Sequence, residues 1–495
     1  MKGEAMGSKT DRRSFLKGTA WMGAAAFAAG CCGPRFGFGA GGSMYGFACA
    51  PLKRVRIGLI GIGGRGTSAL KRLCQIPGCA VVALCDLRPE RIDACNRLLS
   101  EAGCARAKGY CGPEAYKTLC DSDTVDVIYI AGNWQMHCPV GHYAVAHGKH
   151  TFIEVPSAFT LDQCWEFVEL AEKHRVHCMQ LENCCYGEAE LLCLNLCRMG
   201  KLGELVHGEA AYIHDLRGMN YADDPTPGIS NRGYYGHWRL KWNAVHGGNQ
   251  YPTHGLGPVC QCMGINRGDR FDCLCSMDSK QANFEAYGRA NWPAGDWHHE
   301  QKVRMGDMNT TVIRTALGRT IMLQHDVSSP RPYTRLNLVS GTRGVFRGGN
   351  FTDEATVDFG VRFGWEETSG AGVHKFFTKE RMRELRRELA HPYWKTASGI
   401  AQKVGGHGGM DFLMDLRWAY CLQNGLPMDM DVYDLASWCS ICELSETSSA
   451  ERRYVDVPDF TRGAWRTNKP LGVVDVDMSR LEFRTVRKDE NQMNV

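Results

Sequence analysis

A glycine-rich turn that follows a buried strand is the feature that most constrains this chain of 495 residues. Residues 54–60 change from alternating basic and apolar to fully apolar, which predicts a strand entering a parallel sheet with both faces covered. The pattern Gly61-x-Gly63-x-x-Gly66 comes next, and residues 67–76 are predicted to form the following helix. This order of strand, turn and helix is typical of a domain that binds a dinucleotide.

An acidic residue at the end of the next strand indicates which dinucleotide is bound. Asp86 ends the apolar run 80–86, where a carboxylate accepts hydrogen bonds from the adenine ribose. Its charge would repel a 2′-phosphate, so the sequence favours NAD over NADP, while Arg88 leaves NADP open. The N-terminus of the following helix would stabilise the pyrophosphate charge.

Strand and helix patterns alternate through this part of the chain and change character after it. Helices are expected over 89–102 and up to residue 145, and strands over 125–131 and 151–154. A helix to about residue 174 and a strand over 176–181 precede further strand patterns at 205–213, 303–317 and 320–326. The expected fold class is α/β: an N-terminal Rossmann doubly wound sheet plus a C-terminal α+β domain with a largely antiparallel open sheet.

The N-terminus has the pattern of an export signal. Residues 11–17 contain Arg12-Arg13 in a twin-arginine context, and the small apolar stretch 18–30 is too short to span a bilayer. We expect a twin-arginine signal peptide, and either a periplasmic protein or a lipoprotein anchored through Cys31. The expected division is a signal peptide at 1–30, a linker at 31–50, an NAD-binding Rossmann domain at 51–157 and a substrate domain at 158–495.

Charge and cysteine content exclude two classes of partner. The net charge is only +4 and no basic run is interleaved with aromatic residues, so nucleic acid is not expected. The 24 cysteines show no repeat with zinc spacing, so no metal is expected. Cysteines such as Cys85 and Cys164 lie in apolar patterns as small buried residues, although a few disulfides stay possible.

A second motif gives the first family resemblance. Residues 147–156 resemble the glucose–fructose oxidoreductase and inositol dehydrogenase family, whose members usually carry Glu-Lys-Pro where this chain has Glu154-Val155-Pro156. Valine can neither donate nor accept a proton. Residues 134–137 depart in the same way from the usual Asn-x-x-His, which argues against a plain sugar dehydrogenase.

One branch of that superfamily fits these departures. From about residue 54 to 465 the chain resembles glycoside hydrolase family 109, the NAD-dependent α-N-acetylgalactosaminidases, and the resemblance is carried by motifs at 134–137, 181–186, 203–208, 212–217, 238–239, 251–258, 325–326, 331–333 and 406–411. The resemblance implies that NAD stays bound and is regenerated in each turnover. In that route NAD⁺ takes a hydride from C3 of the sugar, a base removes the C2 proton, and the C1–O bond breaks. Water then adds at C1 and NADH returns the hydride.

The resemblance also implies two sets of binding residues. The cofactor set is Gly61, Gly63, Gly64, Arg65, Gly66, Asp86, Trp134, Gln135, Met136, His137, Glu154, Val155 and Asn183. The sugar set is Tyr212, Arg239, Tyr251, Pro252, Thr253, His254 and Tyr333. The candidate catalytic groups are His254 and Tyr251, which share a loop, and Tyr186, which follows a strand; their order of proton transfer stays open.

Two other classes of function stay open. An NAD(P)-dependent sugar or inositol oxidoreductase with net redox change is disfavoured by Val155 and by export, because no NAD pool renews the cofactor outside the cytoplasm. A non-catalytic carbohydrate-binding lipoprotein is disfavoured by the presence of Tyr186, His254 and Tyr333. Members of the resembled family commonly pair through the second sheet, so a homodimer is expected.

Overall fold

The computed structural model describes residues 42–223, 233–348, 361–365, 375–472 and 474–483. The predicted signal peptide, Cys31 and the first part of the predicted linker lie outside the described residues. The second part of that linker, residues 42–50, packs against the protein: Met44 is buried, and its backbone N–H donates to the Tyr433 hydroxyl at 3.0 Å. This segment therefore belongs to the folded domain.

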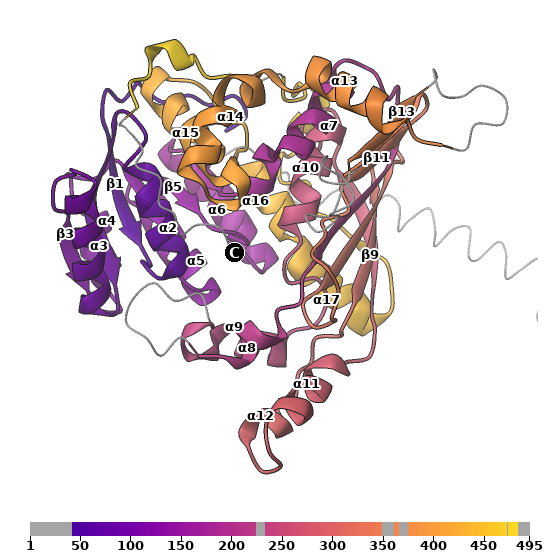
Figure 1. Cartoon of the computed structure of the whole chain (residues 1–495), viewed down its shortest axis with the longest axis horizontal. Helices are drawn as coiled ribbons and strands as arrows, with labels where there is room; N and C mark the ends of the chain where they lie inside the picture. Colours follow the sequence, from indigo (N-terminus) through magenta and orange to yellow (C-terminus); the bar gives the residue numbers. More distant parts are fainter. Residues whose placement is uncertain (1–41, 224–232, 349–360, 366–374, 473, 484–495) are drawn as a thin grey trace, which may run out of the picture. The chain divides into compact units, whose positions relative to one another are not determined.

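A parallel sheet forms the N-terminal part of the described chain (Figure 1). Its strands lie in the order β3-β2-β1-β4-β5-β6. They are β1 (Val55–Ile60), β2 (Cys79–Asp86), β3 (Lys108–Cys111), β4 (Val127–Ile130), β5 (His150–Ile153) and β6 (Cys178–Gln180). Ile57 of β1 lies opposite Val81 on one side and Val127 on the other. The predicted Rossmann sheet is confirmed.

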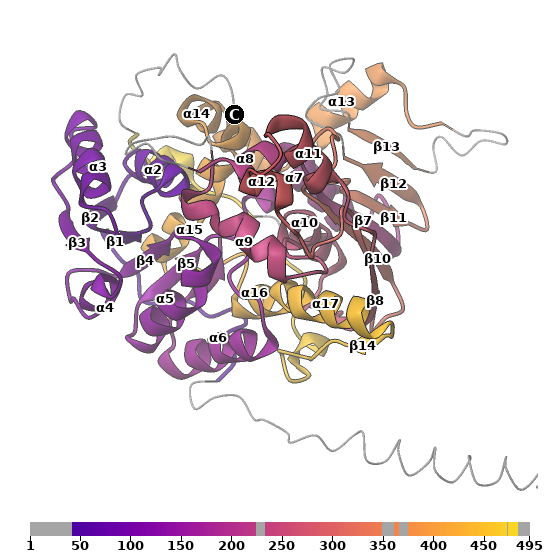
Figure 2. The ribbon, with the colours of Figure 1, turned by 90° about the horizontal axis from the view of Figure 1, so that it is seen from below.

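Helices cover both faces of this sheet (Figure 2). One layer holds α2 (Gly64–Leu73) and α3 (Pro89–Glu101), and the other holds α4 (Ala115–Cys120), α5 (Trp134–Ala146) and α6 (Leu161–His174). Ile57 and Leu59 point into one hydrophobic cluster, whereas Ile60 belongs to another. Burial on both faces explains why these strands are continuous apolar runs rather than alternating ones.

The parallel sheet continues past the expected domain boundary at residue 157. Its last strand, β6, pairs in parallel with β5, and α6 connects the two. A short apolar run predicts a strand but does not indicate which sheet the strand joins. The parallel pairing of β6 with β5 decides which sheet this strand joins, and it extends the nucleotide-binding sheet to Gln180.

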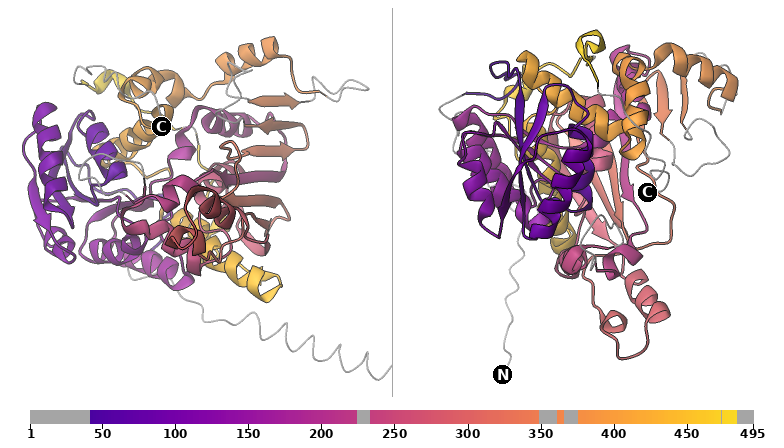
Figure 3. Two further views of the ribbon diagram at one scale, coloured as in Figure 1. Left: turned by 60° about the horizontal axis from the view of Figure 1, so that its bottom comes forward. Right: turned by 60° about the vertical axis from the view of Figure 1, so that its left-hand side comes forward.

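A mixed, mostly antiparallel sheet follows (Figure 3). Among the described residues its order is β13-β12-β11-β7-β10-β9-β8-β14. The strands are β7 (Leu205–Ile213), β8 (Phe271–Asp278), β9 (Asn309–Thr315), β10 (Thr320–Asp326), β11 (Leu338–Gly341), β12 (Gly344–Arg347), β13 (Arg362–Trp365) and β14 (Val455–Asp456). β7 and β10 pair in parallel and the other neighbours are antiparallel, which confirms the expected second sheet. β9 is shorter than the predicted strand 303–317.

Helices of the second domain lie between the two sheets (Figure 1). α10 (Thr253–Met263) packs on β7, and α15 (Met410–Asn424) reaches α2, where Arg72 Nε donates to Asp415 at 2.8 Å. The short 3-10 segment η1 covers Asn183–Tyr186. The other α-helices of this domain in the described ranges are α7 (Glu188–Arg198), α8 (Arg217–Tyr221), α9 (Trp238–Val245), α11 (Asn283–Asn291), α12 (Trp297–Glu300), α13 (Lys379–Leu389), α14 (Pro392–Val404), α16 (Val432–Cys439) and α17 (Ile441–Glu451). No helix in the described ranges has the length and apolar character needed to cross a membrane.

Candidate functional site

The glycine-rich turn between β1 and α2 has the shape that a pyrophosphate requires. Gly61 has φ of 80°, in the left-handed region that favours glycine. A Cβ at Gly66 would lie 2.0 Å from the Gly61 carbonyl oxygen, so glycine lets α2 approach the turn. A Cβ at Gly63 would meet nothing within 4 Å, which leaves its backbone open to a ligand at the N-terminus of α2.

The turn also positions Asp86 at the end of β2. Its carboxylate accepts hydrogen bonds from the backbone N–H of Ile62 at 2.9 Å and of Arg88 at 3.0 Å. A carboxylate has about four acceptor positions, so Asp86 can still accept from two ribose hydroxyls. The Arg88 guanidinium lies over the Tyr235 ring, 4.3 Å from its centre. These residues fit an NAD-type dinucleotide.

A buried carboxylate of the second domain joins three of the predicted cofactor residues. Arg65 donates to Glu154 at 2.7 Å and to Asp411 at 2.6 Å, and the Asn183 amide also donates to Asp411. Burial acts to raise the pKa of Asp411, but Arg65 and His407 beside it hold that pKa well below its ordinary value. Asp411 lies in the first turn of α15. It belongs to the motif 406–411, which contributes to the family resemblance but does not indicate that Asp411 pairs with Arg65.

The other predicted cofactor residues lie around the start of α5 and the end of β5. Trp134 is the first residue of α5, and its ring stacks on Tyr251 with 5.8 Å between centres. Gln135 is exposed and Met136 half-buried. His137 is buried, and its Nδ1 lies 2.7 Å from the Pro156 carbonyl oxygen. Burial lowers the pKa of His137, although hydrogen bonds to two backbone carbonyls oppose this shift. Val155 follows the end of β5 and Gly64 begins α2.

The centre of the site is a chain of three polar side chains. His254 Nδ1 lies 2.8 Å from Glu182 Oε1, and Tyr251 Oη lies 3.3 Å from His254 Nε2. Glu182 is fully buried; burial acts to raise its pKa, but His254 and nearby hydrogen bonds lower it overall. Because the ionised carboxylate only accepts, Nδ1 carries a proton and donates to it, which leaves Nε2 to accept from Tyr251. Sequence reasoning missed Glu182, although it belongs to the motif 181–186.

A buried cation surrounded by aromatic rings lies beside this chain. The Arg239 guanidinium is 4.8 Å from the Trp134 ring centre, 5.1 Å from that of Tyr251 and 5.8 Å from that of Tyr212. Within the described part of the chain, its Nε and Nη2 have no hydrogen-bond partner, while Nη1 donates to Tyr234. A buried guanidinium with unused donors is costly unless a ligand accepts from them.

Two more predicted sugar residues complete the cluster. The Tyr212 ring is 4.4 Å from that of Tyr251 and 6.0 Å from that of Tyr333. Burial raises the pKa of Tyr212 to about 12, although Arg239 acts in the opposite direction. Pro252 and Thr253 are buried at the start of α10, directly before His254.

The structure does not bring Tyr186 to this cluster, which corrects its assignment as a catalytic candidate. Tyr186 is 2% exposed, and its hydroxyl donates to Asp429 at 3.0 Å. Asp429 in turn accepts from Arg417. Position after a strand made Tyr186 a candidate, but the η1 turn directs its side chain into this buried ion pair.

The cysteines add one feature to the site. Every cysteine in the described ranges is a free thiol, so the disulfides that the sequence allowed do not occur there. Cys184 lies with Glu182 and His254 in a group whose potential ligand atoms are within 4.8 Å of one another. We assign these groups to hydrogen bonding, because the carboxylate and Nδ1 already satisfy each other.

Comparison with known proteins covers nearly the whole described chain. The family model for the C-terminal domain of glycosyl hydrolase 109 matches residues 186–467, and the model for the oxidoreductase family with an NAD-binding Rossmann fold matches residues 55–181. An α-N-acetylgalactosaminidase of Bacteroides fragilis is 43% identical over 424 residues, which cover 86% of this chain and 96% of the relative. A glycosyl hydrolase family 109 protein of Shewanella amazonensis is 42% identical over 472 residues, covering 94% and 99%.

Solved structures share the fold at low sequence identity. An NAD-binding oxidoreductase from Klebsiella pneumoniae has a TM-score of 0.60 at 19% identity, covering 82% of this chain and all of the other. Levoglucosan dehydrogenase in complex with NADH and L-sorbose has a TM-score of 0.58 at 17% identity, with the same coverage. At these identities the likeness supports the two-domain fold alone.

Proposed function

From the membership of this chain in glycosyl hydrolase family 109, we propose that it removes terminal α-linked N-acetylgalactosamine from glycans, with NAD retained through each turnover. The chain is a glycoside hydrolase with an NAD-binding domain. The observation that carries the proposal is the Glu182–His254–Tyr251 chain, which meets Trp134 of the nucleotide domain through the Tyr251 ring. This arrangement combines a proton acceptor with a nucleotide site and needs no pair of catalytic carboxylates.

The chain of polar groups is suited to moving the proton of a sugar hydroxyl. NAD⁺ supplies the hydride chemistry at C3 of the sugar when it is bound. Tyr251 takes the C3 hydroxyl proton as it gives its own proton to His254 Nε2, while Glu182 stabilises the resulting imidazolium. The acceptor for the Tyr251 proton, His254 Nε2, lies 3.3 Å from the Tyr251 hydroxyl.

A second hydroxyl, that of Tyr212, lies near Tyr251 and can contact the sugar. Tyr212 stays protonated near neutral pH in the free protein because burial raises its pKa to about 12. The Arg239 guanidinium lies beside it, 5.8 Å from the Tyr212 ring centre. The unused donors of Arg239 also suit the acetamido carbonyl of the substrate. As a protonated hydroxyl, Tyr212 is suited to donate a hydrogen bond to the bound sugar.

One assay separates this proposal from its alternatives. The purified protein is incubated with p-nitrophenyl N-acetyl-α-galactosaminide without added NAD. Hydrolysis without net NADH is expected. Formation of NADH that depends on added NAD would instead support a sugar oxidoreductase, and sugar binding without turnover would support a carbohydrate-binding protein.

An isotope experiment tests the route. Elimination requires the C2–H bond to break, so the released N-acetylgalactosamine should gain deuterium at C2 in D₂O faster than free product does. Direct displacement at C1 would leave that bond intact. Retention of hydrogen at C2, together with no isotope effect from C2-deuterated substrate, would contradict elimination.

A further inference from the structure

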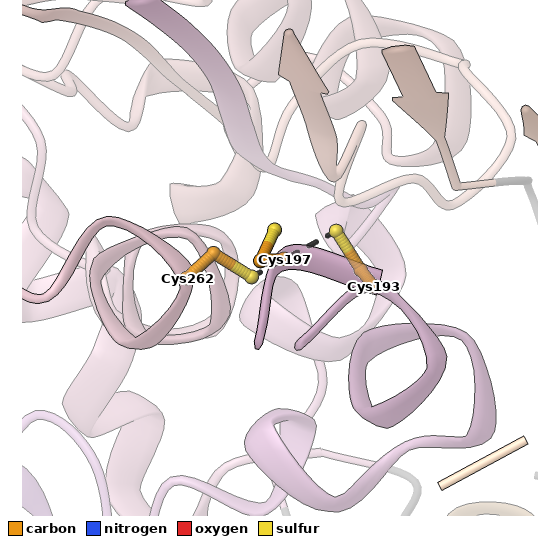
Figure 4. Close-up of side chains that lie close together, drawn as sticks. All are labelled: Cys193, Cys197 and Cys262. Atoms are coloured by element: carbon orange, nitrogen blue, oxygen red, sulfur yellow. Dashed lines mark hydrogen bonds between the residues drawn. The ribbon is translucent and has the colours of Figure 1, made fainter. Parts of the chain in front are cut away.

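Three cysteine thiols from two helices meet outside the site described above (Figure 4). Cys193 and Cys197 are one turn apart on α7, and Cys262 lies near the end of α10. Their sulfur atoms all lie within 4.8 Å of one another, and those of Cys193 and Cys262 are 3.7 Å apart. Cys193 and Cys262 are buried, whereas Cys197 is partly exposed.

These separations match three thiolates around one ion. Metal–sulfur bonds of about 2.3 Å in a trigonal plane place the sulfur atoms about 4 Å apart. A disulfide would require about 2.05 Å and would use only two of the three thiols. In the described ranges, the group contains no His, Asp or Glu as a fourth ligand. Three soft ligands without a fourth favour Cu(I) over Zn(II), which is usually four-coordinate.

The charge around the trio is also suitable. Arg198 follows Cys197 directly and donates to the backbone carbonyls of Gln261 and Cys262, so its guanidinium is held beside the sulfur atoms. A cation in this position favours the ionised form of the thiols. Thiolate is the form that binds metal.

We propose that Cys193, Cys197 and Cys262 bind one Cu(I) ion. Each thiol releases its proton to solvent as its Cu–S bond forms, and copper stays Cu(I), so no oxidant or reductant is consumed. The ion would link α7 to α10, whose first turn carries His254. Its expected effect is therefore to stabilise the helix that presents the catalytic histidine.

The test uses the full chain, reduced and handled without oxygen. Cu(I) is titrated against a colorimetric Cu(I) chelator, with Cys197→Ser and Cys262→Ser as variants and Cys273→Ser, a partly exposed cysteine on β8, as the matched control. We expect the wild type and the control to withhold one Cu(I) per chain and to show a higher melting temperature with the metal. The two variants should lose affinity by a factor of roughly 10 or more.

Two results would overturn the proposal. One is equal Cu(I) retention by the wild type and Cys197→Ser, when circular dichroism shows both to be folded. The other is a disulfide between two of these cysteines in protein purified without reductant, detected by differential alkylation and mass spectrometry. Glycosidase activity is measured in parallel, so that failure of this metal site is distinguished from failure of the proposed reaction.

Discussion

At the scale of single residues, two tyrosines show how the surroundings of a side chain decide its role. Tyr251 lies against Trp134 and Arg239, with its hydroxyl facing His254. Tyr186 is more deeply buried than Tyr251, and its hydroxyl donates to Asp429. The two residues therefore form a matched pair for mutation, because the same atom is removed from each.

The substitution Tyr251→Phe should lower kcat by roughly 10²–10⁴-fold, because it removes the group that passes a proton to His254. Tyr186→Phe should keep kcat of the folded protein and lower the free energy of unfolding by about 1–3 kcal/mol, because a buried acceptor on Asp429 loses its donor. Steady-state kinetics and denaturant unfolding measure both quantities. An equal loss of kcat in a stable Tyr186→Phe protein would restore Tyr186 as a catalytic candidate.

A buried histidine near the cluster predicts a pH dependence of stability. His325 is 1% exposed, and burial together with Arg239 lowers its pKa to about 3. In the unfolded chain its pKa is about 6.5, so between these values the unfolded state binds the extra proton and stability falls as the pH falls. The slope from this residue is about 1.4 kcal/mol per pH unit.

The variant His325→Gln should therefore lose less stability than the wild type between pH 7 and pH 5. His299→Gln, at a partly exposed histidine of α12, serves as the control and should follow the wild type. The free energy of unfolding is measured by chemical denaturation at both pH values. Parallel pH profiles for the wild type and His325→Gln would show that His325 titrates alike in the folded and unfolded states, which would contradict this prediction.

At the scale of secondary-structure elements, the position of α10 against β7 decides where His254 lies. Gly255 follows that histidine, and a Cβ at Gly255 would lie 2.2 Å from the backbone nitrogen of Ala211. No rotamer change relieves a clash with backbone, so the helix itself has to move. Glycine at this position therefore allows α10, and with it His254, to lie close to the second sheet.

The substitution Gly255→Ala should destabilise the protein by about 1–3 kcal/mol and lower kcat, because α10 is displaced from β7. Gly399→Ala is the matched control: this glycine lies in α14, and an added Cβ meets nothing within 4 Å. Helix propensity predicts that the control gains up to about 1 kcal/mol. Unchanged kinetics for Gly255→Ala would show that α10 accommodates the methyl group without moving His254.

At the scale of the whole molecule, both domains contribute to the dinucleotide site. Arg65 of the nucleotide domain donates to Asp411 of α15, and Arg72 donates to Asp415 one turn later. The Arg72–Asp415 pair is buried and the Arg65–Asp411 pair is partly buried, and both arginines lie on α2, which begins after Gly63. A cofactor that binds there would be held by both domains.

We therefore expect NAD(H) to copurify with the protein. Chromatography of the supernatant after denaturation should show NAD(H) rather than NADP(H), because Asp86 disfavours a 2′-phosphate. Asp411→Asn should lower the NAD content, whereas Gly399→Ala should not. An active preparation that contains NADP(H), or no nucleotide, would contradict this assignment.

Export is a second property of the whole chain, and we propose it on the motif at Arg12 and Arg13. Replacement of both arginines by lysine should leave the precursor in the cytoplasm of a bacterial host that has the twin-arginine translocase. Cell fractionation and immunoblotting measure this, and incorporation of labelled lipid at Cys31 tests the anchor separately. Normal export of the double-lysine protein would rule out the twin-arginine route.

The sequence by itself determined the parts of this protein that depend on near neighbours. Apolar runs and periodicity predicted β7 and β10 with the bounds that the structure has. The turn at Gly61 was equally predictable, because a backbone conformation that favours glycine leaves a local signature. Family resemblance added Tyr251, His254 and Arg239, which the structure brings together.

Only the tertiary structure decided which distant groups complete the site. Packing makes Glu182 the partner of His254, because η1 and α10 meet within the second domain, and it makes Asp411 the partner of Arg65, because the two domains meet there. Tyr186 is excluded for the same reason, since its nearest acceptor is Asp429. Hydrogen bonds and ion pairs act over a few ångströms, so partners far apart in the chain are chosen by packing rather than by sequence pattern.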